Sequence, residues 1–350
     1  MPLPLVEDGD HVLSARVYAC RKIVLVSVRR SGPLAYSPSA GLGQEFLLSD
    51  SNALSPVSHA STHRFGSASV GSSGSAAPAP SLVGSAGGLQ FDLIWDRSVA
   101  HAPSGFLQAV KSAAQSIASL FSTREVINID VGYGEIAGSA LGSGALGESE
   151  SYGYLANYAA VTNALRGDGY SFAASNEPTA SQFFITSAED KAFGYVNPTS
   201  TSLDGYVGFS SAYPMYYGTS GVPAGNQFDL YSIAEHEITE VMGRLGVEGA
   251  SMNGAATYTP FDLFHYSTPG VLALSGSGGY FSTNNGVTNL GAFNNAAANG
   301  GDIADLSSSV ANNSFDAFTA PGIVGVLTSN DVLAVAALGY RLSAHGSSIA

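Results

Sequence analysis

The segment Ala234-Glu235-His236-Glu237-Ile238-Thr239-Glu240-Val241-Met242-Gly243-Arg244 combines the spacing of a short helix with residues that can bind a metal ion. At about 100° per residue, His236, Glu237 and Glu240 share one side of this helix, and Ile238 lies on the other. In zinc-peptidase helices, ligands at i and i+4 hold the metal, and the glutamate after the first ligand is the general base. Glu240 stands where a second histidine is usual. We therefore predict one packed face and one chemical face.

The residues of the chemical face predict a hydrolase that uses a bound metal ion. A divalent metal acidifies water and polarises a carbonyl, which addresses both difficulties of peptide hydrolysis. His236 and Glu240 would be the metal ligands, and Glu237 would take the proton of the metal-activated water. A carboxylate can replace imidazole as a zinc ligand, so zinc is the expected metal. Because a carboxylate weakens the Lewis acid, a different metal or a modest rate also remains open.

The third metal ligand has to come from outside this helix. A turn at Gly246 lets the chain double back, and the next segment with suitable groups offers Asp262 and His265. We expect Asp262 to be the third ligand, with His265 as the alternative. A phenol from Tyr266 or Tyr258 is the candidate for stabilising the oxyanion.

Simpler interpretations of the same residues stay open. A helix with several glutamates and one histidine is also typical of a solvated acidic surface. Asp262 is equally suited to a turn or a helix cap, and His265 to a half-exposed loop. Asp302 and Asp305 could bind Ca²⁺, but the glycine-rich nonapeptide pattern of calcium-binding rolls is absent. For this acidic pair a loop-stabilising role is the better prediction.

Composition limits the classes of protein to which this chain can belong. Of 350 residues, 45% are hydrophobic and 11% are charged, and the formal net charge is −14. The apolar fraction argues against global disorder, and the net charge argues against a nucleic-acid partner. No run of 18 apolar residues occurs, so no membrane span is expected. This balance favours a secreted or cell-surface protein, although no clean signal peptide is readable at the N-terminus.

The single cysteine, Cys20, further restricts the chemistry. One cysteine cannot form an intramolecular disulfide or build a Cys-rich metal site. Any metal must therefore be held by nitrogen and oxygen ligands.

The composition also divides the chain into two parts. Residues 1–87 are predicted to be a low-complexity, disordered leader, because residues 55–88 consist mainly of Ser, Ala, Gly and Pro. Residues 88–345 are predicted to form one α+β domain, with a helical and sheet half at 88–243 and a loop-rich half at 244–345. The periodicity predicts strands at 89–95, 126–131, 183–185 and 205–209, and helices at 106–120, 154–165, 230–243 and 331–339. By analogy with zinc peptidases, the strand at 205–209 would line a substrate cleft.

Several segments in the same order resemble a bacterial metalloprotease family that carries a His-Glu-Ile-x-Glu-Val-x-Gly-Arg motif. The resemblance covers roughly residues 89–340 and rests on segments at 127–134, 204–209, 234–244, 262–267, 280–282 and 331–340. The family is distantly similar to metzincin zinc peptidases. The resemblance therefore implies a metzincin-like domain with a small mixed sheet, an active-site helix and a loop-rich C-terminal half.

The resemblance also implies roles for individual residues. It carries His236 and Glu240 over as metal ligands and Glu237 as the base. In metzincins a third histidine follows the helix, but this chain has Gly246 at that place, which has no side chain to offer. The family's Asp-Leu-Phe-x-Tyr-Ser segment has Arg at x where this chain has His265, so the resemblance favours Asp262 as the third ligand.

Together, these observations predict a metal-dependent endopeptidase that acts on protein or peptide substrates. One alternative is a non-catalytic surface or adhesive protein on a degenerate peptidase fold, which the departures at Glu240 and Gly246 would favour. A second alternative is a glycoside hydrolase that uses Glu237 and Glu240. Such carboxylate pairs lie roughly 5–9.5 Å apart across a sugar. Two glutamates three residues apart on one helix seldom straddle a substrate in this way.

Overall fold

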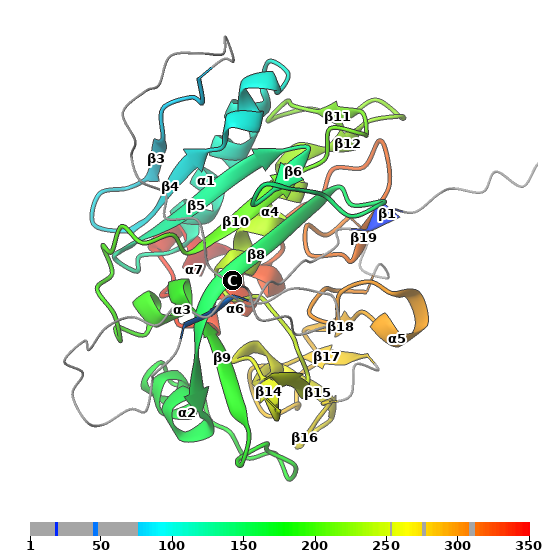
Figure 1. Ribbon diagram of the computed structural model, residues 1–350. Coiled ribbons are helices and arrows are strands. Elements are labelled where there is room, and N and C mark those ends of the chain that lie inside the picture. Colours follow the sequence, from blue (N-terminus) through cyan, green and yellow to red (C-terminus); the bar gives the residue numbers. More distant parts are fainter. Residues whose placement is uncertain (1–17, 20–44, 48–75, 253, 275–277, 308–311) are drawn as a thin grey trace, which may run out of the picture.

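A mixed nine-stranded sheet forms the centre of the molecule (Figure 1). We obtained the fold from a computed structural model, which describes residues 18–19, 45–47 and 76–350 except 253, 275–277 and 308–311. The strand order is β13-β14-β9-β8-β10-β5-β4-β3, and β2 pairs with β8 beside this path. The strands are β2 (Glu45–Leu47), β3 (Ser81–Gly84), β4 (Leu89–Trp95), β5 (Glu125–Tyr133), β8 (Gly147–Asn157), β9 (Gln182–Thr186), β10 (Gly205–Phe209), β13 (Ala250–Met252) and β14 (Ala255–Tyr258).

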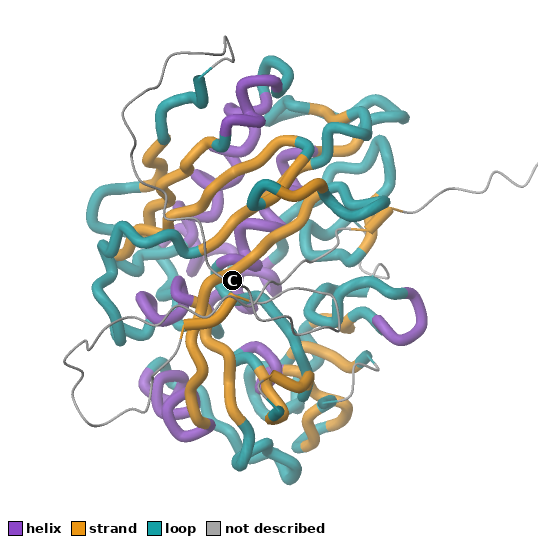
Figure 2. The backbone as a smooth tube through the Cα atoms, in the orientation of Figure 1, coloured by secondary structure: helices purple, strands orange, loops and turns teal. Residues whose placement is uncertain are grey.

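Among the described residues there are seven α-helices and two short 3-10 helices. They are α1 (Phe106–Leu120), α2 (Tyr158–Gly167), α3 (Ser187–Ala192), α4 (Leu230–Val241), α5 (Ala296–Asn299), α6 (Ser329–Ala336), α7 (Ala344–Ile349), η1 (Arg97–His101) and η2 (Phe261–Phe264). α1 and α4 pack against each other, and α4 also contacts β8 and β10. Figure 2 shows these helices behind the strands of the large sheet. The mixed sheet with separate helices agrees with the predicted α+β class.

The chain after α4 is rich in loops, as the sequence predicted. It contains a four-stranded antiparallel sheet in the order β16-β15-β17-β18. Three separate two-stranded pairs complete the strands of the described residues. The elements are β15 (His265–Thr268), β16 (Val271–Leu272), β17 (Gly279–Phe281) and β18 (Gly291–Phe293), with the pairs β6 (Glu135–Ile136) and β7 (Ser139–Ala140), β11 (Met215–Tyr216) and β12 (Phe228–Asp229), and β1 (Tyr18–Ala19) and β19 (Phe318–Thr319).

One large hydrophobic core joins the segments before and after α4. Its buried residues run from Leu89 in β4 to Tyr340 after α6. α1 contributes Phe106, Val110 and Ile117 from the face that the 3.6-residue period predicted. Each large apolar side chain buried in this way contributes about 1.5–3 kcal/mol. The two predicted halves therefore share a core.

The predicted bounds of the leader and of one helix need correction. Strand β3 lies inside the predicted leader and pairs antiparallel with β4, so the ordered part of the chain begins before residue 88. Strands β1 and β2 also lie within the predicted leader, and the rest of residues 1–75 is outside the described part of the chain. The helix predicted at 154–165 begins only at Tyr158, because Tyr154 belongs to β8 and pairs with Ile185.

The predicted cleft strand, β10, is also not at an edge. It pairs in parallel with β5 and antiparallel with β8 over its whole length. Both of its edges are therefore used in the sheet, and a peptide cannot add to either.

In the described part of the chain, no helix is long and apolar enough to cross a membrane.

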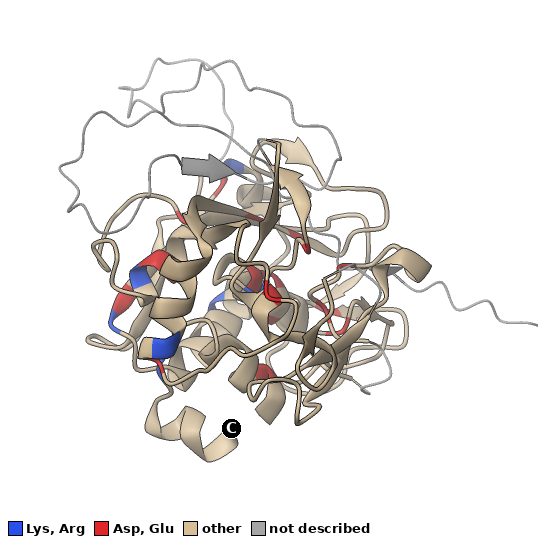
Figure 3. Cartoon of the chain, turned by 90° about the horizontal axis from the view of Figure 1, so that it is seen from below, with Lys and Arg blue, Asp and Glu red and all other residues tan. Residues whose placement is uncertain are grey.

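A row of carboxylates crosses the face of the sheet that points away from α4. Tyr206 in β10 is paired with Asp130 on one side and with Glu150 on the other. Burial, helped by Glu148 and Glu135, raises the pKa of Glu150 to about 8. Burial, helped by Asp96 and Glu135, raises the pKa of Asp130 to about 7. Asp and Glu outnumber Lys and Arg by 27 to 13 in the whole chain, and Figure 3 shows where both kinds of residue lie in the fold.

We expect these raised pKa values to make the protein less stable at pH 8 than at pH 5.5. An unfolded carboxylate titrates near pH ~4, so between that pH and about 8 the folded chain binds more protons than the unfolded chain. Stability therefore falls as pH rises through this window. Glu150→Gln should raise the unfolding free energy at pH 8 by about 1–3 kcal/mol and flatten the slope. Urea unfolding at both pH values tests this, and an unchanged slope in the variant would contradict it.

Candidate metal centre

Helix α4 is held in place at both ends and is buried on nearly every side. It begins after Asp229, the last residue of β12, and ends at Val241. Gly243 then takes a left-handed conformation with φ of 111°, as is common after a helix, and turns the chain away. Apart from Tyr231, all residues of α4 are buried. The predicted chemical face is therefore buried as well, because strand β8 and the C-terminal loops cover it, and the alternative of a solvated acidic surface is wrong.

Three side chains converge on one point at the middle of α4. His236, Glu240 and Asp305 each offer one ligand atom, and these atoms lie within 4.8 Å of one another. His236 Nε2 is 3.5 Å from Glu240 Oε1 and 3.2 Å from Asp305 Oδ1. The helix spacing brings the first two together, as predicted, and the loop after α5 supplies the third. This is the only such group of His, Cys, Asp and Glu in the part of the chain that the structure describes.

The backbone of the loop at Ser314 orients the His236 ring. His236 Nδ1 lies 2.8 Å from the Ser314 carbonyl oxygen, which can only accept a hydrogen bond. A proton on Nδ1 therefore leaves the Nε2 lone pair facing Glu240 and Asp305 when the imidazole is neutral. Metal-bound histidines usually have this arrangement, with the second ring nitrogen donating to a carbonyl or a carboxylate.

Ser149 orients Glu240 from the sheet. Its hydroxyl donates to Glu240 Oε2 over 2.6 Å, which leaves Oε1 on the side of His236. Ser149 pairs with Val207 within the sheet, so the hydroxyl sits on a rigid strand. The sheet thus fixes the second potential ligand.

Arg244 supplies positive charge to the same group. It is fully buried, and its Nη1 donates to Asp305 Oδ1 over 2.7 Å. Its Nη2 lies 3.5 Å from Glu240 Oε1, and its guanidinium lies 4.3 Å from the centre of the Phe315 ring. Burial disfavours ionisation of Asp305, but His236 and Arg244 outweigh burial and lower its pKa to about 2. Burial also disfavours a charged His236, yet Asp305 holds its pKa well above the ordinary value.

Glu237 lies beside this group, and neither of its carboxylate oxygens has a hydrogen-bond partner among the described residues. Only 1% of its surface is exposed, and burial, followed by the charge of Glu240, raises its pKa well above the ordinary value. Gly147 in β8 makes room for it, because a Cβ at that position would lie 2.6 Å from Glu237 Oε1. A buried carboxylate without a partner is costly unless something else satisfies it.

Asp262 does not join the group with His236, which corrects the predicted third ligand. Its Oδ2 accepts from the backbone amides of Thr259 at 2.8 Å, Glu248 at 3.1 Å and Val247 at 3.3 Å. The carboxylate therefore closes the turn after α4, which is the simpler role that the sequence left open. Asp305, and not Asp262, lies with His236 and Glu240 in the group of candidate ligand atoms.

The other residues predicted from the 262–267 segment also have partners elsewhere. His265 Nδ1 is 2.5 Å from Glu248 Oε1, and its Nε2 is 3.1 Å from the Gly278 carbonyl oxygen. The Tyr266 hydroxyl donates to Asn285 Oδ1 over 3.4 Å. Neither side chain belongs to the group around His236, so the structure gives Tyr266 no position for oxyanion stabilisation.

Sequence reasoning missed two residues of the site. The sequence predicts a loop-stabilising role for Asp302 and Asp305. Asp302 fits that role, because its Oδ1 accepts a hydrogen bond from the Ala304 amide over 2.7 Å. Asp305 instead lies in the group around His236. The sequence assigns no role to Arg244. It lies beyond the end of α4, after the turn at Gly243, so no helical repeat indicates its contact with Glu240.

No protein-family model matches this chain, and no curated protein or solved structure shows significant similarity to it.

Proposed function

We propose that the chain is a metal-dependent hydrolase that cleaves peptide bonds, with His236, Glu240 and Asp305 as metal ligands. One observation carries the proposal: three ligand atoms converge within 4.8 Å beside Glu237, a buried carboxylate with no described partner. Asp305 Oδ2 likewise lacks a described hydrogen-bond partner. A divalent cation would satisfy these oxygens and would supply Lewis acidity at this point. The metzincin-like identity of the domain and a location outside the cell belong to the same proposal.

The donor set favours zinc among common metals. One imidazole nitrogen and two carboxylates form a nitrogen and oxygen site of the kind that zinc accepts. Ca²⁺ takes six to eight oxygen ligands, so a site with a histidine nitrogen does not suit it.

The protein's own residues would orient the metal ligands, accept the proton and keep Asp305 ionised. Ser314 and Ser149 fix the orientations of His236 and Glu240 through the hydrogen bonds described above. Glu237 adjoins the ligands and makes no competing hydrogen bond with a described residue, and a bound cation would lower its raised pKa so that the carboxylate could accept a proton. Arg244 keeps Asp305 ionised and pointed at the centre.

Metal content tests this proposal directly. After chelator stripping and reloading with zinc at neutral pH, we expect about one zinc per chain, because the three ligands are already held together. His236→Ala and Asp305→Asn should each lower the bound zinc at least about tenfold at limiting metal. Asp262→Asn is the matched control, since it removes an equally buried carboxylate outside the group and should leave the zinc content unchanged. Elemental analysis of the four proteins that finds no stoichiometric zinc in the wild type would end the proposal.

A second candidate is a non-catalytic protein in which the same residues form a structural ion-pair network. The observation that favours it is the 2.7 Å contact between Arg244 and Asp305, with both side chains fully buried. In that case His236 is protonated, Glu240 and Asp305 are its counter-ions, and the metal measurement gives no stoichiometric zinc. A glycoside hydrolase finds no support in the geometry, because Glu237 and Glu240 lie buried on one helix.

A further inference from the structure

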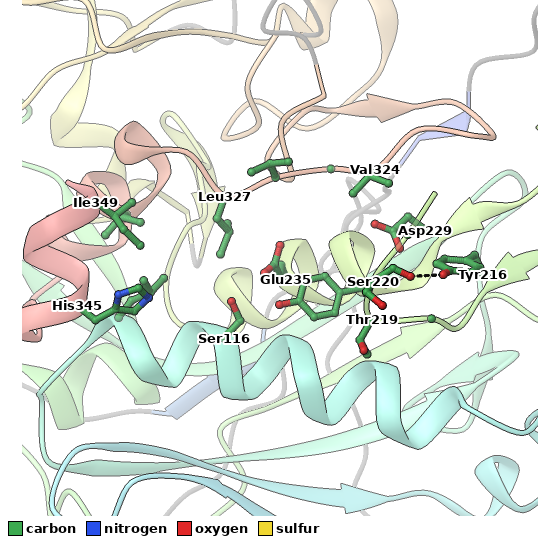
Figure 4. Close-up of a pocket in the computed structure, with 17 residues that line it drawn as sticks. Ser116, Tyr216, Thr219, Ser220, Asp229, Glu235, Val324, Leu327, His345 and Ile349 are labelled. Carbon is green, nitrogen blue, oxygen red and sulfur yellow. Dashed lines mark hydrogen bonds between the residues drawn. The ribbon is translucent and has the colours of Figure 1, made fainter. Parts of the chain in front are cut away.

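A cavity of about 380 Å³ lies beside α4, between α1 and the C-terminal segments (Figure 4). It is bounded by α1, α4, α6 and α7, by the end of β12 and by two loops at 218–221 and 324–327. Its volume falls in the range of sites that hold small organic ligands. Glu235 lines the cavity, whereas His236 and Glu237 do not. The cavity is therefore separate from the metal centre, and an inference about it does not rest on the proposed function.

Two buried carboxylates give the cavity its polar part. Asp229 and Glu235 are 5% and 3% exposed, and both line the cavity. The Ser314 hydroxyl donates to Glu235 Oε2 over 2.9 Å and so holds this side chain in place. Among the described residues that line the cavity, none is Lys or Arg. Burial raises the pKa of Glu235 to about 8 and the pKa of Asp229 above its ordinary value, and His345 is the one basic side chain among the described lining residues.

Aliphatic side chains form another part of the wall. Leu327 and Ile349 lie toward one end of the cavity, and Asp229 lies toward the other, with Glu235 between (Figure 4). The ring of Tyr231, the one α4 residue that is not buried, adds an aromatic surface. A ring of this kind can attract an organic cation through its face. The lining therefore combines acidic groups with apolar contact.

We propose that this cavity binds a small alkylamine as its ammonium cation, with the charged group at Glu235 and Asp229 and the alkyl chain along Leu327 and Ile349. The ammonium group supplies a positive charge and three hydrogen-bond donors for the carboxylate oxygens. The alkyl chain removes the aliphatic wall from water. A cation beside the two carboxyl groups favours their ionised forms, whereas an anion disfavours them.

Hexylamine and 1-hexanol are the probes, because they have the same chain and differ in the charged group. Titration calorimetry on the full-length wild-type chain should show that hexylamine binds at least tenfold more tightly than 1-hexanol. Glu235→Gln and Asp229→Asn should each weaken hexylamine binding at least tenfold. Asp92→Asn in β4 is the control, since it removes one negative charge away from the cavity lining and should leave the affinity unchanged.

The comparison of hexylamine with 1-hexanol needs only the wild-type protein, so it tests the proposed amine site even if a variant fails to fold. Equal affinity for hexylamine and 1-hexanol would overturn the proposal. Hexylamine binding that survives unchanged in folded Glu235→Gln and Asp229→Asn would also overturn it, because the cation would then be bound elsewhere.

Discussion

Glu237→Gln is expected to lower peptide hydrolysis by about 10²–10⁴-fold, the usual contribution of a positioned general base. The amide keeps the shape of the side chain but cannot accept the proton. Zinc content should stay at the wild-type level, because Glu237 is outside the group of three ligand atoms. The measurement is cleavage of a denatured protein substrate by zinc-loaded enzyme, with zinc quantified in the same samples.

The matched control for this substitution is Glu150→Gln. It makes the same chemical change at another buried glutamate, on the opposite face of the sheet from α4. We expect its hydrolysis rate to equal that of the wild type. Equal activity in wild type and Glu237→Gln would refute the role of Glu237. Loss of zinc together with activity in Glu237→Gln would instead make Glu237 a ligand.

Local patterns predicted most elements of this fold because their apolar periods match their burial. The strand at 89–95 alternates, and β4 has the same bounds. α1 also has its predicted bounds, since its apolar residues recur at helical spacing. The N-terminal boundary of the helix predicted at 154–165 is wrong, because tyrosines at 154 and 158 suit a strand and a helix equally well. Pairing of β8 with β9 decides the outcome, and that contact is between distant parts of the chain.

The site was predictable only where its residues belong to one helix. His236 and Glu240 come together through the helical repeat, which the sequence shows directly. Asp305 approaches from a loop 65 residues after Glu240 in the printed numbering, and no local pattern indicates that approach. Asp262 looked suitable because it is near in sequence, but three backbone amides occupy one of its oxygens. Loop geometry of this kind depends on tertiary packing.

The complete burial of the site gives Arg244 a central place in both candidate functions. Glu240 and Asp305 bring two negative charges into the interior, and Arg244 and His236 are the groups that face them. If a cation binds at this point, it neutralises part of the negative charge of Glu240 and Asp305 that Arg244 and His236 otherwise neutralise. The two functions therefore differ in how far the protein's stability depends on added zinc.

Arg244→Met is accordingly expected to destabilise the chelated protein by about 3–5 kcal/mol, the usual cost of breaking a buried ion pair. Methionine fills much of the space beside Phe315 but leaves Asp305 and Glu240 without the guanidinium. Urea unfolding in the presence of a chelator measures this loss. Arg124→Met, at an exposed position before β5, is the control and should change the unfolding free energy by less than about 0.5 kcal/mol.

Zinc should restore much of the stability of Arg244→Met if the metal centre is real. An ion that binds only the folded chain adds about 2.7 kcal/mol at a concentration one hundred times its dissociation constant. Its two positive charges would replace the one that was removed, so the variant should gain at least as much from zinc as the wild type. A structural ion-pair network predicts the same loss in chelator but no recovery with zinc. An Arg244→Met protein as stable as wild type in chelator would contradict both functions, because the two buried carboxylates would then not need this arginine.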